Sequence, residues 1–318
     1  MSMPKLNFGL LGAAGYIAPR HLSAIAGVGG SLSVALDPSD SVGILDQYFP
    51  SAQFFTEFER FDRYVEKIKR AGSGLNYLTI CSPNYLHDSH IRFGLRVGAD
   101  VICEKPLVLN PWNLDALCQM ERETGCTVNT ILQLRLHPSI VTLKSKLDSE
   151  DRGRKHDVDL TYITSRGSWY QRSWKGDEKK SGGIATNIGV HFFDMLGWIY
   201  GERKQSYVHL RTPSKAAGFL EYERARVRWY LSLDAADLPD SVSKSGQRTY
   251  RSITENGSEI EFSGGFTDLH LRSYEKIIGG EGFSAEDNRV AIETVSEIRT
   301  AEVNPSLGEA HPYVSKRS

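Results

Sequence analysis

The most informative stretch near the start of the chain is Phe8-Gly9-Leu10-Leu11-Gly12-Ala13-Ala14-Gly15. Its apolar residues predict a buried strand that leads directly into a glycine turn, and the pattern from Ile17 to Ile25 predicts a helix after it. Glycine lets a backbone approach a pyrophosphate, and the N-terminus of the following helix then faces the negative charge. The spacing Gly-x-x-Gly-x-x-Ala is longer than the usual dinucleotide-binding form, so an ordinary strand-to-helix turn stays open as the alternative.

Strand-like and helix-like patterns continue to alternate after this turn. Further strands are predicted at residues 32–37, 77–81, 100–103 and 127–132, with helices between them. This alternation predicts a parallel, doubly wound sheet whose ligands bind at the carboxyl ends of the strands. Asp37 ends the second strand, where it can accept hydrogen bonds from an adenosine ribose and repel a 2′-phosphate, which favours NAD over NADP. The alternative role of Asp37 is to cap a turn before Pro38.

The second part of the chain has a different character. Long β-type runs lie at residues 157–169, 206–212, 219–235 and 248–262, and Asn256-Gly257 signals a hairpin. Helices are predicted at residues 138–147, 184–200 and 283–302, and the tail after Asn304 is expected to be frayed. We therefore predict an α/β protein. A Rossmann domain is expected at residues 1–130, and an α+β domain with a mostly antiparallel, open sheet at residues 131–318.

One strand of the second domain is predicted to have two different faces. Arg224, Arg226 and Arg228 alternate with Ala225, Val227 and Trp229. Side chains alternate across a strand, so this pattern gives one polar and one apolar face of the sheet. An open face of this kind often pairs with another subunit, so a homo-oligomer is expected.

Composition limits the classes of function. The 318 residues are 40% hydrophobic, enough for two domains with their own cores, and the formal charge of −1 argues against nucleic acid as a partner. The four cysteines contain no Cys-x-x-Cys pair, which suits free thiols in a reducing cytoplasm. The apolar residues 8–18 are short and broken by glycine, and no other run approaches membrane-spanning length, so no membrane association is expected.

Two loops at predicted strand ends carry candidate site residues. Ser82-Pro83-Asn84 and His87 follow one strand, and Glu104-Lys105-Pro106 follows the next. Parallel strands end at the same edge of a sheet, so both loops are expected over the cofactor crevice. A lysine beside a nicotinamide can orient a substrate hydroxyl and stabilise a developing alkoxide. The structural alternatives are a helix cap at Asn84 and a loop ion pair between Lys105 and Glu104.

A predicted helix in the second part carries Asn187, His191 and Asp194 within an apolar segment. Their spacing places the three polar side chains on one helical face. Histidine titrates near neutral pH and is the natural base to take a hydroxyl proton as hydride leaves the same carbon. The structural alternative is a core histidine held by Asp194. Two ligands with an asparagine make a poor metal site, so no metal is assigned.

Cations and aromatic rings are concentrated in residues 165–176, just before that helix. The candidates are Arg166, Tyr170, Trp174 and Lys175. Guanidinium and ammonium groups match phosphate or carboxylate, and flat rings pack on sugars or bases. The segment therefore predicts a substrate loop, and a solvated surface loop stays open as the alternative.

Taken together, these motifs give the chain a family resemblance. The glycine turn, Ser82-Pro83-Asn84-x-x-His87, Glu104-Lys105-Pro106 and Gly189-x-His191-x-x-Asp194 stand in the order seen in the Gfo/Idh/MocA oxidoreductases, which the chain resembles along nearly its whole length. The resemblance implies a Rossmann domain, an α+β domain whose open sheet builds dimers and tetramers, and catalysis by Lys105 and His191. Many members have aspartate where this chain has Asn187, and this departure from the family pattern suggests an orienting role in place of a charged relay. The NAD contacts that it implies are Gly12, Gly15, Tyr16, Ile17, Asp37, Ser82, Pro83, Asn84, His87, Glu104, Lys105 and Gln133.

Residues 80–87, 101–108 and 185–194 are similar, more narrowly, to one bacterial branch of that family. The branch oxidises the 3′-hydroxyl of a UDP-linked N-acetylglucosaminuronic acid with NAD, in making sugars for the lipopolysaccharide O-antigen. Some relatives re-oxidise bound NADH with 2-oxoglutarate. A dehydrogenase of another sugar or cyclitol, and a non-catalytic NAD-sensing regulatory protein, stay as alternatives. The substrate contacts that the resemblance implies are Arg166, Tyr170, Trp174, Lys175, Asn187 and His191.

Overall fold

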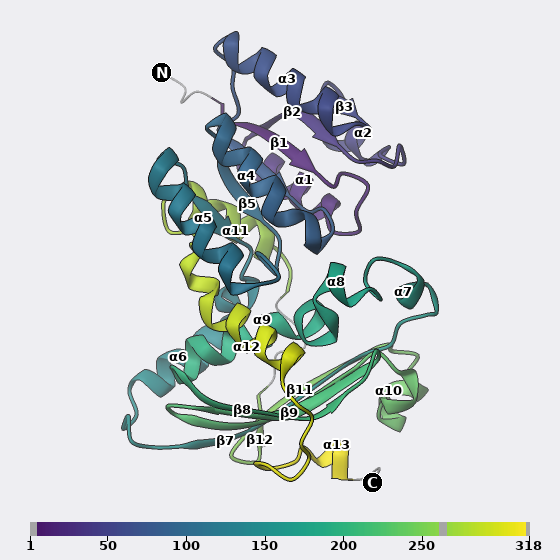
Figure 1. Ribbon diagram of the computed structural model, residues 1–318, viewed down its shortest axis with the longest axis vertical. Helices are drawn as coiled ribbons and strands as arrows, with labels where there is room; N and C mark the ends of the chain where they lie inside the picture. Colours follow the sequence, from purple (N-terminus) through teal and green to yellow (C-terminus); the bar gives the residue numbers. More distant parts are fainter. Residues whose placement is uncertain (1–4, 261–265, 316–318) are drawn as a thin grey trace. The chain divides into compact units, whose positions relative to one another are not determined.

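A computed structural model describes residues 5–260 and 266–315 (Figure 1). The chain folds into two compact units, and the first takes in the described residues up to Gln133 together with Asp268–Arg289. The second unit holds the described residues of Leu134–Thr267 and those from Val290 onward. The sequence suggested one boundary after residue 130 and no such return of the chain to the first unit.

The first unit is built on a six-stranded sheet in the order β3-β2-β1-β4-β5-β6. Every neighbouring pair in this sheet is parallel, and the order reverses direction at β1, as in doubly wound nucleotide-binding folds. The predicted Rossmann architecture is confirmed. The three-residue strand β3 was not predicted, because so short a segment gives no periodic signal. The strands are β1 (Asn7–Leu11), β2 (Ser31–Leu36), β3 (Gln53–Phe55), β4 (Tyr77–Ile80), β5 (Asp100–Cys103) and β6 (Val128–Thr130).

Helices of the first unit begin and end at residues suited to those positions. Pro111 lies in the first turn of α5, and Gly125 ends this helix in the left-handed conformation.

Helix α11 packs on α1, and Tyr274 and Ile277 join the hydrophobic core that includes Phe8 and Leu22. The helices are α1 (Ala18–Gly27), α2 (Ile44–Tyr48), α3 (Phe58–Arg70), α4 (His87–Val97), α5 (Pro111–Thr124) and α11 (Leu269–Ile278), with 3₁₀ turns η1 (Asn84–Leu86) and η5 (Glu286–Asn288).

The second unit is built on a six-stranded sheet in the order β12-β11-β7-β10-β9-β8. The β7–β10 pair is parallel and the other pairs are antiparallel, which confirms the predicted mostly antiparallel sheet. The hairpin signal is also confirmed, since Asn256 and Gly257 have φ of 50° and 81° between β11 and β12. The strands are β7 (His156–Thr164), β8 (Arg203–Arg211), β9 (Lys215–Tyr222), β10 (Ala225–Ser232), β11 (Thr249–Glu255) and β12 (Ser258–Glu259).

The main core of the second unit joins this sheet to its long helices. Phe193 of α9 meets Trp229 of β10 edge to face, with ring centroids 5.4 Å apart, and both side chains are buried. The 3₁₀ turn η2 (Gln133–Leu136) precedes these helices. The helices of this unit, long and short, are α6 (Pro138–Asp148), α7 (Trp169–Arg172), α8 (Glu178–Ser181), α9 (Val190–Tyr200), α10 (Asp240–Lys244), α12 (Arg289–Thr300) and α13 (Pro312–Ser315), with the π-helical turn η3 (Ala185–Gly189) and the 3₁₀ turn η4 (Ala235–Asp237).

The C-terminal segment lies along the sheet of the second unit. Val303 bridges to Val208, and the His209 Nε2–H donates to the Leu307 carbonyl at 2.6 Å. Further on, His311 is buried, with its ring 5.8 Å from that of Tyr230. The prediction of a frayed tail after Asn304 was wrong, because the aromatic and histidine side chains that anchor the segment are spaced too irregularly to give a sequence pattern. Among the described residues, no helix has the length and apolarity needed to cross a membrane.

Candidate active site

The glycine turn after β1 has the geometry of a close backbone approach. Gly12 has a φ of +92°, and a Cβ placed there would come within 2.6 Å of the Cys81 and Ser82 backbone. Only glycine fits such a position without strain. The Gly15 amide donates to the Gly12 carbonyl at 3.0 Å, which closes the turn just before α1. This cradle suits the pyrophosphate of a dinucleotide, which needs bare backbone and a helix N-terminus.

Asp37 closes the same turn from the end of β2. Its Oδ2 accepts a hydrogen bond from the Ala14 amide at 3.0 Å, and its Oδ1 accepts one from the Ser39 amide at 2.9 Å. The turn-capping alternative is therefore what the structure shows. An ionised carboxylate has about four acceptor sites, so these bonds leave capacity for a ribose diol. Tyr16, in the same turn, is 89% exposed.

His87 joins the two loops that follow β4 and β5. Its Nδ1 lies 2.8 Å from the Pro106 carbonyl and its Nε2 lies 2.8 Å from the Ser82 carbonyl. The ring is buried, and burial lowers the pKa of His87 against the raising effect of these two carbonyls. Both ring nitrogens face the protein backbone, so His87 shapes the loops. The Lys105–Pro106 peptide bond between these contacts is cis.

Glu104 is buried at the end of β5, beside the half-buried Lys105. Its Oε1 accepts hydrogen bonds from His21 Nε2 at 3.1 Å and His270 Nε2 at 3.0 Å, and its Oε2 accepts one from the Lys105 amide at 3.2 Å. Burial raises the pKa of Glu104, but the bonds from His21 and His270 outweigh burial and hold it well below its usual range. No local sequence pattern links either histidine with Glu104.

The same three side chains could in principle offer ligands to a metal ion. In the described part of the chain, ligand-type atoms of His21, Glu104 and His270 lie within 4.8 Å of one another. Both histidine nitrogens, however, point at one carboxylate oxygen at ordinary hydrogen-bond lengths. We interpret the group as a hydrogen-bond network.

In the second unit, the helix predicted over residues 184–200 is divided. Residues 185–189 form the π-helical turn η3, and α9 begins at Val190. Single π-helical turns occur often at functional sites. The Asn187 amide Nδ2 donates to the hydroxyl of the buried Tyr170, so two of the predicted substrate residues meet. His191 lies half-buried in the first turn of α9.

Asp194 forms a buried ion pair with Arg135 of η2. Arg135 Nη2 donates to Oδ1 at 2.6 Å and Nε donates to Oδ2 at 3.1 Å, with side chains only 8% and 3% exposed. Both carboxylate oxygens thus face the guanidinium. Arg135 was missed because nothing local marks two charges so far apart in sequence as partners.

In the basic and aromatic segment of residues 165–176, two tryptophan rings pack against the ammonium group of Lys175. The Lys175 Nζ lies 5.2 Å from the ring centroids of both Trp169 and Trp174. Burial lowers the pKa of Lys175, and the nearby Arg166 cation lowers it further by a smaller amount. The loop therefore holds a partly desolvated cation between aromatic faces, an arrangement that suits an anionic, sugar-containing ligand.

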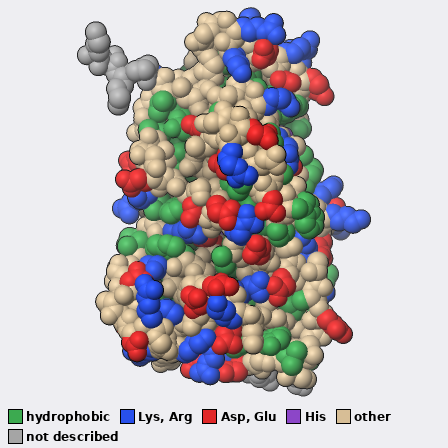
Figure 2. All heavy atoms as spheres, turned by 60° about the vertical axis from the view of Figure 1, so that its left-hand side comes forward, with side chains coloured by type: hydrophobic (Ala, Val, Ile, Leu, Met, Phe, Trp, Pro, Cys, Tyr) green, Lys and Arg blue, Asp and Glu red, His purple; other side chains and the backbone are tan. Residues whose placement is uncertain are grey.

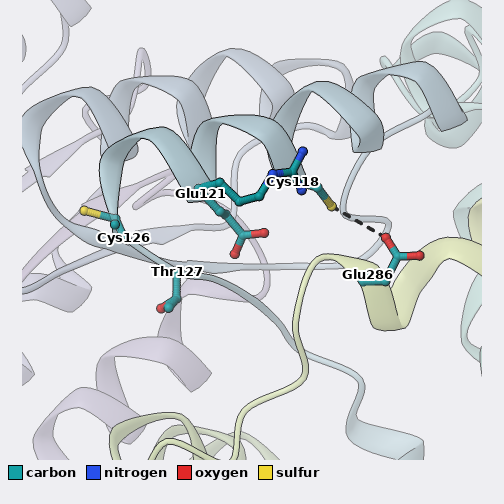
Figure 3. Close-up of a pocket in the computed structure, with 7 residues that line it drawn as sticks. Cys118, Glu121, Cys126, Thr127 and Glu286 are labelled. Atoms are coloured by element: carbon teal, nitrogen blue, oxygen red, sulfur yellow. Dashed lines mark hydrogen bonds between the residues drawn. The ribbon is translucent and has the colours of Figure 1, made fainter.

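A separate hollow lies away from these residues, beside α5 and η5 (Figure 3). Cys118, Glu121, Cys126 and Glu286 line it, and the Cys118 thiol donates to Glu286 Oε2 at 3.7 Å. The hollow contains none of the predicted site residues. Acidic and basic side chains are mixed over the face shown in Figure 2.

Family models match most of the chain. An oxidoreductase-family model with an NAD-binding Rossmann fold matches residues 6–131, and the C-terminal α/β domain model of the same family matches residues 144–240. The chain belongs to the Gfo/Idh/MocA oxidoreductase family. The family resemblance, the two-part fold and the NAD cofactor expected from the sequence are all confirmed.

Two crystal structures of WlbA (WbpB) dehydrogenase from Thermus thermophilus are close neighbours. One, in complex with NAD and alpha-ketoglutarate, is 51% identical with a TM-score of 0.94, and it covers 97% of this chain and 99% of that one. The other, in complex with NAD and UDP-GlcNAcA, is 50% identical with a TM-score of 0.93 over the same shares. Inositol 2-dehydrogenase of Rhizobium meliloti is 27% identical over 63% of this chain, and the match spans only 57% of that relative.

Proposed function

We propose that this chain is an NAD-dependent dehydrogenase that oxidises the 3′-hydroxyl of UDP-GlcNAcA. One observation carries the proposal: the likeness to Thermus thermophilus WlbA, which is 51% identical over a match that covers 99% of that chain. A second structure of the same Thermus protein holds NAD together with UDP-GlcNAcA. The Gly12 cradle and the Asp37 carboxylate fit NAD independently of that likeness.

Bound NAD supplies the hydride acceptor. His191 takes the hydroxyl proton as general base, a role worth about 10² to 10⁴ in rate. Lys105 donates a hydrogen bond to the same oxygen and stabilises its developing negative charge. Asn187 orients the sugar or His191, and its own amide is held by the bond to Tyr170.

The loop around Lys175 binds the charged groups of the substrate, away from the hydroxyl that is oxidised. UDP-GlcNAcA carries a diphosphate and a carboxylate, and Arg166 and Lys175 are the cations that would pair with them. Trp174 offers an aromatic face beside Lys175, on which a sugar or base can pack. Discrimination against neutral sugars would follow from these cations.

The remaining expectations form part of the same proposal. The alpha-ketoglutarate complex of the Thermus neighbour supports 2-oxoglutarate as the substrate that re-oxidises bound NADH. A cytoplasmic homo-oligomer that serves O-antigen synthesis stays a prediction. The likeness to inositol 2-dehydrogenase favours a cyclitol dehydrogenase as the second candidate.

A nicotinamide fluorescence assay separates the candidates. Purified protein is incubated with NAD and, in parallel, UDP-GlcNAcA, UDP-GlcNAc or myo-inositol. We expect NADH only from UDP-GlcNAcA, because UDP-GlcNAc lacks the carboxylate and inositol lacks the nucleotide. Turnover of inositol alone would favour the second candidate, and NAD binding without any substrate-dependent signal would indicate a regulatory protein.

A further inference from the structure

A connected network of buried polar groups surrounds Glu104, at the point where β5 ends. The groups come from three elements of the first unit: Thr79 from β4, His21 from α1, and His270 and Tyr274 from α11. All are at least 90% buried. Helix α11 follows the strands of the second sheet in sequence but belongs to the first unit (Figure 1).

The direction of each hydrogen bond follows from the carboxylate. An ionised Glu104 only accepts, so the Nε2 atoms of His21 and His270 both carry hydrogen and donate to Oε1. The Nδ1 of a neutral His21 then accepts, and Tyr274 lies 2.9 Å away to donate its hydroxyl hydrogen. Tyr274 in turn accepts from Thr79 at 2.9 Å. Every group has a consistent role, which is the condition under which a buried network stabilises one arrangement.

The network acts on the loop of Lys105. The remaining carboxylate oxygen of Glu104 accepts the Lys105 backbone amide, and His87 holds the Pro106 carbonyl on the other side. Glu104 is therefore fixed by two imidazole donors and fixes Lys105 in its turn. We propose that His270 and His21 are positioning residues that place the Lys105 amine for catalysis by holding the Glu104 carboxylate.

This inference rests on the proposed function, because it assigns the effect of the network to Lys105. His270→Phe keeps a ring of similar size and removes the donor. His270→Gln keeps an amide N–H that can still donate to Glu104. Ile277→Ala is the matched control, since Ile277 is buried on the same helix and belongs to the hydrophobic core.

The test measures kcat and both KM values with UDP-GlcNAcA and NAD, with thermal denaturation in parallel. We expect His270→Phe to lower kcat about 10-fold to 100-fold, with KM changed less than about threefold, because a misplacement near 1 Å can cost that much in rate. His270→Gln should recover most of kcat. Ile277→Ala should lower the melting temperature and leave kcat near that of the wild type.

A double variant separates positioning from general damage. If His270 acts through Lys105, His270→Phe lowers kcat in the wild type and has no further effect in a Lys105→Ala background. An equal loss of kcat in both backgrounds, or a loss matched by Ile277→Ala, would overturn the positioning role. Unchanged turnover in Lys105→Ala itself would instead refute the catalytic assignment of the proposed function.

Discussion

The buried ion pair between Arg135 and Asp194 gives the most quantitative prediction. Each side chain is more than nine-tenths buried, and the two bonds between them are 2.6 and 3.1 Å long. Asp194 lies on α9, the helix that carries His191. We consider Arg135→Met, Asp194→Leu and the double substitution, which replaces the pair with apolar side chains of similar volume.

Each single substitution leaves one buried charge without its counter-ion. Removing one partner of a buried pair costs about 3–5 kcal/mol, whereas replacing both partners by apolar groups is often close to neutral. The double substitution should therefore cost less than the sum of the singles. We expect a coupling energy of at least about 2 kcal/mol between the two positions.

Urea unfolding followed by tryptophan fluorescence measures these energies. Trp169, Trp174, Trp198 and Trp229 all belong to the second unit, so the signal reports mainly on the unit that holds the pair. Lys144→Ala is the control, because Lys144 forms a surface pair with Asp148 that is worth well under 1 kcal/mol. Additive costs for the two buried positions, within about 0.5 kcal/mol, would refute the reasoning.

Four further outcomes follow from the structure. Gly12→Ala should destabilise the first unit by about 1–3 kcal/mol and weaken NAD binding, because a φ of +92° and the nearby backbone leave no room for a Cβ; wild-type urea stability would contradict this. Asp37→Ser should shift the kcat/KM ratio toward NADP about tenfold or more, since a repulsion of about 1.4 kcal/mol is removed, and steady-state kinetics with both cofactors measures it. His191→Ala should lower kcat about 10² to 10⁴-fold at saturating substrate, and a near wild-type rate at high pH would remove it as the base. Burial lowers the pKa of His311 to about 3, so its ring stays neutral in the folded protein at pH values below about 6.5, where the unfolded chain binds a proton. The free energy of unfolding should therefore fall as the pH drops from about 6.5 toward 3. Urea unfolding at several pH values should show a weaker pH dependence of this free energy in His311→Phe.

Local sequence patterns predicted the fold well. The apolar strand before Gly12, the acid at Asp37 and the loops after β4 and β5 follow from short-range periodicity and turn chemistry, which a single sequence carries. The Asn256-Gly257 hairpin was found in the same way.

The contacts that hold the candidate site were harder to find. His270 reaches Glu104, and Arg135 reaches Asp194, across long separations in sequence and without any local pattern. The π-helical turn that contains Asn187 was predicted as ordinary helix, because its apolar residues fit both geometries. Partners of this kind depend on tertiary structure, so the sequence indicates the reactive side chains better than the groups that support them.

The return of residues 268–289 to the first unit has a consequence for biosynthesis. Tyr274 and Ile277 complete a core that begins with Phe8, so the nucleotide-binding sheet emerges from the ribosome without one of its covering helices. Domains generally fold as they are synthesised, N-terminal part first. Here the nascent chain must leave the α1 surface exposed until residues 268–289 have been translated, and premature termination anywhere before residue 268 yields a nucleotide domain with an open hydrophobic face.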